Sequence, residues 1–271
     1  MSGPGGDARR ADGPGLLDGP LDGLRDGLVD GLSPGGRPAA SDLAIAGLVA
    51  LSTCDWPDHL VATVFLQGCP WRCTYCHNVS ILDCQTPGIV GWDDVTDLLD
   101  RRVGLLDGVV FSGGEPTRQA GLVDAARLVR DRGFGVGLHT AGAYPAALAR
   151  VLPLVDWVGL DIKAPARLYR AVTGVGGPTT CADAAFRSLR LVLDAGVDCQ
   201  VRTTVDPTVM TDLDVAELTA TLRGLGVHDH VRQTVRPEGT SPAYRQRSAV
   251  TYEVTRLAEP MESVDEGVVE H

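Results

Sequence analysis

Hydrophobic and polar positions fall into two alternating patterns from about residue 42 onward. Short apolar runs, which predict strands, occur at 60–67, 108–116, 134–140, 155–163, 197–205 and 230–237. Amphipathic stretches, which predict helices, separate them at 91–102, 121–133, 144–153, 181–196 and 212–226. Such alternation predicts an α/β fold with parallel strands joined by helical crossovers. About six such units fit either an open doubly wound sheet or a partial (β/α)6 barrel.

The two ends of the chain lack this pattern. Residues 1–41 are rich in Gly, Pro and Asp, and the glycines of their D-G-L repeat weaken any helix. We expect a disordered tail there, a core domain over 42–249 and a frayed acidic tail over 250–271. No apolar run reaches the roughly 18 residues that a membrane span needs, and no secretory signal is visible. We therefore expect a soluble, cytoplasmic protein that does not contact membranes.

Composition adds an exclusion and two unusual residues. The net charge of −11 argues against a nucleic-acid-binding surface, which needs clustered Lys and Arg. Lys163 is the only lysine of the chain, and Glu115 is the only glutamate before Glu217. Both lie in the central region of the chain. Each would indicate a functional position if it falls beside other candidate site residues.

Three closely spaced cysteines follow the first core strand. Cys69, Cys73 and Cys76 have the spacing C-x3-C-x2-C, whereas structural zinc sites and ordinary iron–sulfur clusters take four ligands. A zinc site with His77 would need two adjacent residues to reach one ion. A 4Fe-4S cluster held by three thiolates would leave one iron open to another ligand.

Two further explanations of the three cysteines are that they share no function, or that a fourth cysteine elsewhere in the chain completes a cluster. Three unrelated buried cysteines would not need this spacing. A four-cysteine cluster would need an isolated fourth ligand, because the sequence has no second C-x2-C. The candidates are Cys54, Cys84, Cys181 and Cys199. These four are otherwise interpreted as small apolar residues or free thiols.

The other predicted strands also end in polar or glycine-rich segments, and the carboxyl ends of parallel strands meet at one edge of a sheet. The second ends in SGGEP, which an ordinary turn would also explain. The fourth ends in LDIK, whose acid and lysine point to one face and would otherwise form a surface ion pair. The positions concerned are Gly113, Gly114, Glu115, His139, Thr140, Asp161, Lys163, Arg202 and Gln233.

The cysteine spacing, with Tyr75 before the last cysteine and SGGEP on the next strand, resembles the radical S-adenosylmethionine (radical SAM) superfamily. The resemblance implies that S-adenosylmethionine chelates the open iron. It also implies that an electron from the cluster breaks the sulfonium bond and yields a 5′-deoxyadenosyl radical. The expected metal ligands are Cys69, Cys73 and Cys76. The expected cofactor-binding residues are Tyr75, Cys76, His77, Gly113, Gly114, Glu115, Thr140, Asp161, Lys163 and Arg202.

Longer segments resemble glycyl-radical enzyme activases, and among them the activating proteins of anaerobic ribonucleoside-triphosphate reductase. They are FLQGCPWRCTYCHN, GLLDGVVFSGGEPT, LVDWVGLDIKAP and YRAVTG. The resemblance implies an anaerobic (class III) ribonucleotide reductase as the partner and flavodoxin or ferredoxin as the electron donor.

Other functions stay open at this point. The chain could act on another glycyl-radical enzyme or on a small molecule. Outside this activity, it could be an iron–sulfur electron-transfer protein or a metal-stabilised binding module.

Overall fold

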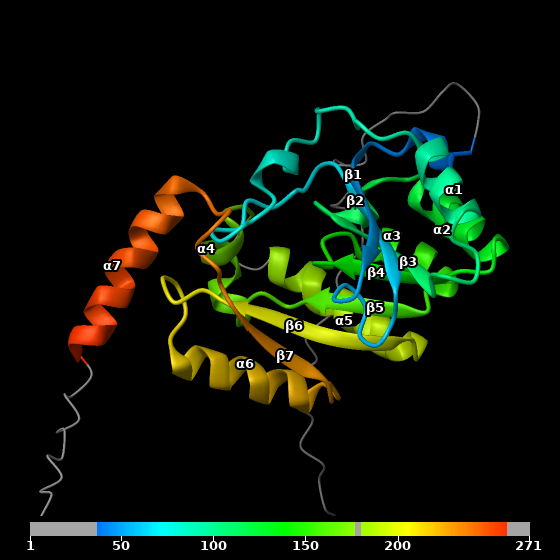
Figure 1. Cartoon of the computed structure of the whole chain (residues 1–271). Helices are drawn as coiled ribbons and strands as arrows, with labels where there is room; N and C mark the ends of the chain where they lie inside the picture. The colour runs from blue at the N-terminus through cyan, green and yellow to red at the C-terminus, as the bar shows by residue number, and fades with distance from the viewer. Residues whose placement is uncertain (1–36, 177–179, 259–271) are drawn as a thin grey trace, which may run out of the picture. The chain divides into compact units, whose positions relative to one another are not determined.

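A computed structural model describes residues 37–176 and 180–258. Its centre is one seven-stranded sheet with the strand order β1-β2-β3-β4-β5-β6-β7 (Figure 1). β1 runs antiparallel to β2, and each later neighbour is parallel. The strands are β1 (Ile45–Ser52), β2 (Val61–Leu66), β3 (Gly108–Gly113), β4 (Gly135–Thr140), β5 (Trp157–Asp161), β6 (Asp198–Val205) and β7 (His230–Thr234).

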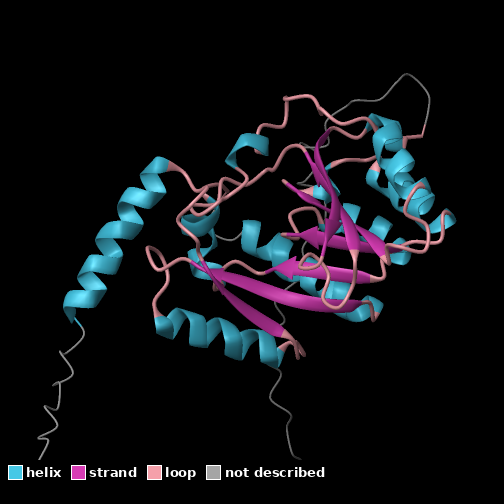
Figure 2. Cartoon of the chain, viewed as in Figure 1, coloured by secondary structure: helices cyan, strands magenta, loops and turns pink. Residues whose placement is uncertain are grey.

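Helices follow the strands as the sequence pattern predicts (Figure 2). They are α1 (Trp92–Asp100), α2 (Leu122–Asp131), α3 (Pro145–Val151), α4 (Tyr169–Thr173), α5 (Thr180–Ala195), α6 (Asp212–Gly224) and α7 (Pro242–Ala258). In α2 the helical period decides which side chains are buried, because Leu122, Ala125, Ala126 and Val129 share one face. At the start of α6, Thr211 and Asp214 form a capping box.

The sequential order of the strands decides between the two predicted architectures. A doubly wound sheet reverses its strand order, whereas here every crossover from β2 to β7 proceeds in the same direction. Right-handed crossovers that all proceed in one direction place their helices on one face of the sheet. The fold is therefore the predicted partial barrel, with β1 and β7 at its two open edges.

The register of the strands brings predicted site residues together. Leu66 at the end of β2 is opposite Gly113 at the end of β3, so the cysteine segment and SGGEP begin side by side. Asp161 at the end of β5 is opposite Arg202 of β6. The polar carboxyl ends consequently form one continuous rim.

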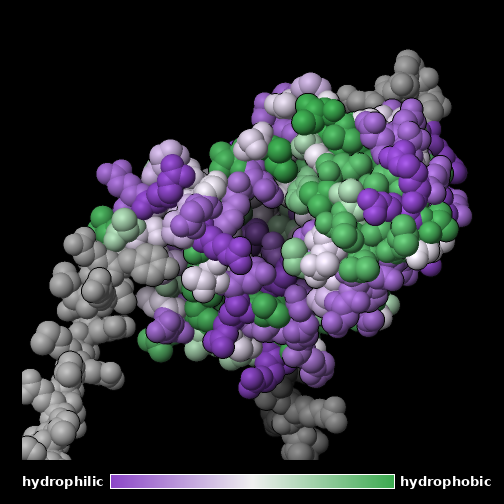
Figure 3. All heavy atoms as spheres, in the orientation of Figure 1, coloured by the Kyte–Doolittle hydropathy of each residue, from purple (hydrophilic) through white to green (hydrophobic). Residues whose placement is uncertain are grey.

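The structure differs from the expected element boundaries in three places. β1 was not predicted. It is an edge strand whose Val49 and Leu51 remain exposed, and apolar residues gather over the β1–β2 hairpin in the space-filling view (Figure 3). The ordered fold begins before residue 42, because residues 40–42 form a 3-10 helix and the Ala40 amide donates to Asp124.

The predicted boundary at 249/250 falls inside α7. Pro242 begins this helix, and the Ser241 hydroxyl caps it by accepting from the Tyr244 amide, so its start signals precede the acidic stretch. The expected tails at 1–36 and 259–271 lie outside the described residues. No helix in the described part of the chain is long and apolar enough to cross a bilayer.

Candidate functional site

A pocket of about 680 Å³ opens at the carboxyl ends of the parallel strands. Figure 3 shows it as a hollow with a hydrophilic floor. All the predicted site residues except Glu115 line this pocket, and so do His139 and Gln233. The pocket is also lined by Trp71, Asn78, Ser112, Ala141, Thr204, Thr234, Val235 and Arg236, which sequence reasoning did not assign.

The cysteine loop, defined here as residues 67–78, brings all three thiols of the motif to this pocket. Its beginning is fixed by the amides of Gly68 and Cys69, which donate to Ile81 and Leu82 at 2.8 and 3.1 Å. These contacts hold the start of the loop against the 3-10 helix that follows it.

The middle of the loop is fixed by α4. The amides of Arg72 and Thr74 donate to the carbonyls of Thr173 and Val172, at 2.8 and 2.9 Å. Gly174 ends α4 at φ +69°, and a Cβ there would lie 2.8 Å from the Arg72 carbonyl oxygen. The YRAVTG segment therefore shapes the cysteine loop, a role that its sequence did not reveal.

The two glycines of SGGEP are required by backbone packing. A Cβ on Gly114 would lie 2.2 Å from the Gly68 carbonyl oxygen, and one on Gly113 would lie 2.4 Å from the Leu66 nitrogen. The Gly114 amide donates to Leu66 and the Glu115 amide donates to Gly68, both at 2.9 Å. Only glycine permits this approach of the turn to the loop.

Glu115 lies behind the pocket wall rather than in it. It is fully buried, and its carboxylate accepts from the hydroxyls of Thr117 and Thr140 at 2.6 Å each. It also accepts from the amides of Thr117 and Ala141 at 3.1 and 2.9 Å. Burial raises the pKa of Glu115, while these four donors oppose that change. The described contacts thus use the carboxylate to join the SGGEP turn to the end of β4, and no ligand ammonium is needed to satisfy it.

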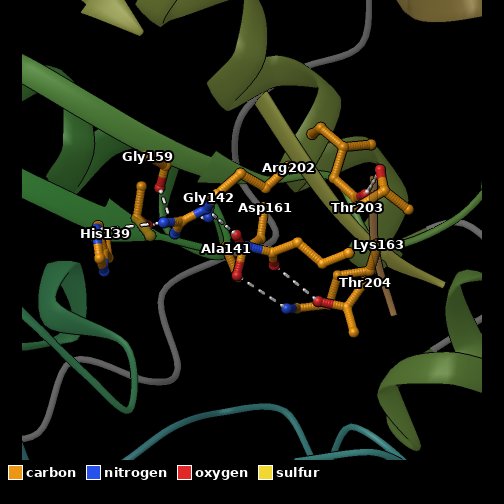
Figure 4. Close-up of polar contacts among 12 residues, drawn as sticks. His139, Ala141, Gly142, Gly159, Asp161, Lys163, Arg202, Thr203 and Thr204 are labelled. Carbon is orange, nitrogen blue, oxygen red and sulfur yellow. Dashed lines mark hydrogen bonds and ion pairs between the residues drawn. The ribbon is translucent and has the colours of Figure 1, made fainter. Parts of the chain in front are cut away.

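The predicted pair of Asp161 and Lys163 forms, and Arg202 joins it (Figure 4). One carboxylate oxygen of Asp161 lies 3.4 Å from Lys163 Nζ, and the other accepts from Arg202 Nε at 3.0 Å. The side chains of Lys163 and Arg202 are only 11% and 13% exposed. Burial opposes ionisation of Asp161, but the two cations outweigh it and lower its pKa. Two cations around one carboxylate leave this rim with a positive balance.

His139 lies beside Arg202 at the same rim (Figure 4). Its Nε2 lies 2.6 Å from the Asp55 carbonyl oxygen and 3.3 Å from Arg202 Nη1. The shorter contact is to an atom that can only accept, so we assign the proton to Nε2. Nδ1 then accepts from the Ser112 hydroxyl at 3.1 Å. Burial and the neighbouring Arg202 lower the pKa of His139 to about 4, so the ring is neutral near pH 7.

Tyr75 contributes an unpaired polar atom to the wall of the pocket. Its side chain is buried against the pocket, 5.7 Å from Lys163 Nζ to the ring centroid. Its hydroxyl has no hydrogen-bond partner among the described residues. Since a buried unpaired hydroxyl is costly, a group bound in the pocket is the natural partner.

The donor set fits a cluster better than a single ion. All seven cysteines are free thiols, and in the described residues no three Cys, His, Asp or Glu side chains converge on one metal ion. A structural zinc site requires such convergence. An iron–sulfur cluster places each thiolate on a different iron, so three thiols spaced around one pocket suit it. Cys54, Cys84, Cys181 and Cys199 do not line the pocket.

Comparison with known families identifies the family of this chain. The sequence model of the Radical SAM superfamily matches residues 63–223, more than half of the chain. The chain belongs to the radical SAM superfamily. A 4Fe-4S cluster and S-adenosylmethionine are the cofactors of this family, and the three thiols with the unpaired Tyr75 hydroxyl fit them.

The chain is also similar to proteins that are named as activating enzymes of glycyl-radical enzymes or of pyruvate formate-lyase. A Methanocaldococcus jannaschii protein named as a candidate glycyl-radical enzyme activating enzyme is 29% identical over 183 residues, 66% of this chain and 75% of that protein. The pyruvate formate-lyase-activating enzyme of Clostridium pasteurianum is 33% identical over 161 residues, 54% of this chain and 62% of that protein.

Two solved structures with bound S-adenosylmethionine share the fold. SuiB of Streptococcus suis bound to S-adenosylmethionine matches with a TM-score of 0.52 at 13% identity, over 71% of this chain and 46% of that one. The structure of anSMEcpe with bound AdoMet matches with a TM-score of 0.50 at 19% identity, over 63% of this chain and 48% of that one.

One buried residue that sequence reasoning missed supports the cysteine loop from behind the pocket. Asp206, just after β6, is fully buried and accepts a hydrogen bond from the Thr74 hydroxyl of the cysteine loop. It also accepts from Thr208 and from the Tyr244 hydroxyl of α7, which lies 3.1 Å away. Asp is abundant in this chain, so no sequence signal separates Asp206 from the solvated ones.

Proposed function

We propose that this protein is a radical SAM activase that generates a glycyl radical on the anaerobic (class III) ribonucleotide reductase. The observation that carries the chemistry is the set of three motif thiols, a positive rim and an unpaired buried hydroxyl around one pocket. A pure electron-transfer protein needs no such pocket beside its cluster. The resemblance of the cysteine loop and of the LDIK and YRAVTG segments supports the choice of the reductase.

Different residues of the pocket would bind the cluster and S-adenosylmethionine. Cys69, Cys73 and Cys76 would hold three irons of the cluster. The Lys163 ammonium makes one hydrogen bond in the described part of the chain, to Asp161, so it retains donors for the carboxylate of S-adenosylmethionine. The Tyr75 hydroxyl offers a further polar contact in the same wall. Bound together, the two cofactors supply one-electron chemistry that removes a hydrogen atom from a C–H bond.

The remaining site residues orient this first set. Arg202 bonds Asp161 and also donates to the Gly159 carbonyl at 3.4 Å, so it fixes the carboxylate that positions Lys163. Glu115 locks the SGGEP turn, which packs against the start of the cysteine loop. We expect the glycine of the partner to enter at the edge of the pocket that Thr204 and Arg236 line.

Pyruvate formate-lyase is a second candidate partner. The named activating enzyme of Clostridium pasteurianum supports it, as does the Escherichia coli pyruvate formate-lyase 1-activating enzyme, 35% identical over 112 residues. The latter similarity covers 36% of this chain and 44% of that protein. In either case we expect reduced flavodoxin or ferredoxin to supply the electron, in the cytoplasm.

The test uses cluster-reconstituted full-length protein under anaerobic conditions. Dithionite, S-adenosylmethionine and either the reductase or pyruvate formate-lyase of the same cell are added in separate tubes. Electron paramagnetic resonance then detects a glycyl-radical doublet, and 5′-deoxyadenosine is measured from the same tube. Cys73→Ala should abolish both signals, whereas Cys54→Ala, at an exposed thiol outside the pocket, should retain them.

Each outcome decides between the candidates. A doublet on the reductase alone supports the proposal, and a doublet on pyruvate formate-lyase alone replaces the partner. Formation of 5′-deoxyadenosine without any doublet rules out both proteins as the partner and favours a small-molecule substrate. The absence of both signals at full cluster loading favours an electron-transfer protein.

A further inference from the structure

A second pocket, of about 280 Å³, lies against the cysteine loop. Cys73 and Cys76 line both this pocket and the cofactor pocket, so these two residues form a wall between them. The other lining residues come from the outer part of the loop, the following 3-10 helix and the start of α7. They are Arg72, Thr74, Val79, Leu82, Ser241 and Arg247.

The two walls of this second pocket are tied together. Asp206 accepts from the Thr74 hydroxyl in the loop and from the Tyr244 hydroxyl in α7. Tyr244 is fully buried, and its ring lies 5.7 Å from the guanidinium carbon of Arg247. The start of α7 is therefore held beside the cysteine loop by a buried carboxylate, and the rest of the helix extends away from the loop (Figure 1).

The second pocket is positively charged on a protein that is strongly acidic. Arg72 and Arg247 line it and no acidic residue does, whereas the chain carries a net charge of −11. Arg72 donates to the carbonyl oxygens of Cys69 and Trp71 at 2.6 and 3.0 Å, which holds its charge beside the loop. Asp83, the residue after Leu82, does not line the pocket, and its carboxylate accepts from the Gln85 amide and the Thr86 hydroxyl.

An apolar contact accompanies the two arginines. Val79 is 45% exposed at the edge of the pocket, and Leu82 is partly buried beside it. A positive surface with an apolar spot suits a docked protein with an acidic face, because complementary charge steers association and apolar burial retains the complex.

We propose that this second pocket is the docking site of an acidic, low-potential one-electron carrier protein. The inference rests on the proposed function, which fills the cofactor pocket with S-adenosylmethionine and the substrate glycine. The electron must then enter from another direction, and Cys73 and Cys76 would be the cluster ligands that line the second pocket. The carrier would lose one electron and the bound cluster would gain it, with no bond made or broken.

The test measures carrier binding directly. Full-length, cluster-loaded protein is titrated with oxidised flavodoxin by anaerobic calorimetry, at about 50 mM and about 300 mM salt. Arg247→Glu should raise the dissociation constant about tenfold or more at low salt, as expected for reversal of one interfacial charge. Arg245→Glu is the control, because Arg245 is also an exposed arginine of α7 but lies outside the pocket, and it should change the dissociation constant less than threefold.

A second measurement separates docking from catalysis. Bleaching of cluster absorbance by reduced flavodoxin should slow in Arg247→Glu by a similar factor, whereas bleaching by dithionite should keep its wild-type rate. Equal flavodoxin binding by Arg247→Glu and the parent protein would overturn the proposal. So would Arg247-dependent binding of inorganic phosphate without any flavodoxin binding, because the pocket would then be a small-anion site.

These results are independent of the glycyl-radical assay. That assay uses dithionite, so a missing doublet refutes the partner and leaves the docking result intact. A normal doublet with dithionite and salt-independent flavodoxin binding refutes the docking site and leaves the proposed function intact.

Discussion

The contact between the SGGEP turn and the cysteine loop makes Gly114→Ala the sharpest test of how this site is held. A Cβ at position 114 would lie 2.2 Å from the Gly68 oxygen, whereas ordinary van der Waals contact begins near 3.4 Å. The obstructing atoms belong to the backbone, so turn and loop must separate by about 1.2 Å. That movement weakens the Gly114–Leu66 and Glu115–Gly68 hydrogen bonds.

The expected cost is the sum of overpacking and weakened hydrogen bonds. Overpacking costs about 1–3 kcal/mol, and each backbone hydrogen bond about 0.5–1.5 kcal/mol. Gly114→Ala should therefore lower the free energy of unfolding by about 2–6 kcal/mol and the melting temperature by about 4–24 °C. Thermal unfolding of the cluster-free chain measures this directly, and iron content after reconstitution should fall in parallel because Cys69 follows the displaced Gly68.

Gly224→Ala is the matched control. Gly224 ends α6 with ordinary helical geometry, and an added Cβ there meets nothing within 4 Å. That substitution should be neutral or stabilise the chain by up to about 1 kcal/mol. The reasoning is refuted if Gly114→Ala unfolds like the parent and loses only affinity for S-adenosylmethionine. Gly114 would then serve the approach of the cofactor rather than backbone packing.

Three further predictions follow from the polar contacts. Asp161→Asn leaves the buried Lys163 and Arg202 without their shared anion and should destabilise the chain by about 2–4 kcal/mol in urea unfolding at pH 7. Because the pKa of Asp161 is lowered, the wild-type advantage should be present above the ordinary carboxyl pKa and shrink as pH falls through the folded value. His139 binds its proton less well when folded, so between pH 6.5 and about 4 acidification should destabilise the wild type by at most about 3 kcal/mol. Its ring signals in nuclear magnetic resonance should not titrate above pH 5. Thr74→Val removes the loop's hydrogen bond to the buried carboxylate after β6 and should reduce cluster occupancy after reconstitution more than it lowers the melting temperature.

The sequence alone determined what depends on spacing and period. The C-x3-C-x2-C motif identified the thiols, because three cysteines within eight positions must lie on one loop. Alternating apolar runs predicted the parallel strands, and this alternation placed each motif at a strand's carboxyl end. The pairing of Asp161 with Lys163 followed from the two-residue period of a strand.

Tertiary structure alone decided which neighbours these residues meet. Glu115 was expected in the pocket, yet it faces the hydroxyls of Thr117 and Thr140 behind the wall. The link from Thr74 to Asp206 spans 132 positions of sequence. The second pocket exists because α7 returns to the cysteine loop. Contacts over such separations are set by strand order and helix packing, which no local pattern encodes.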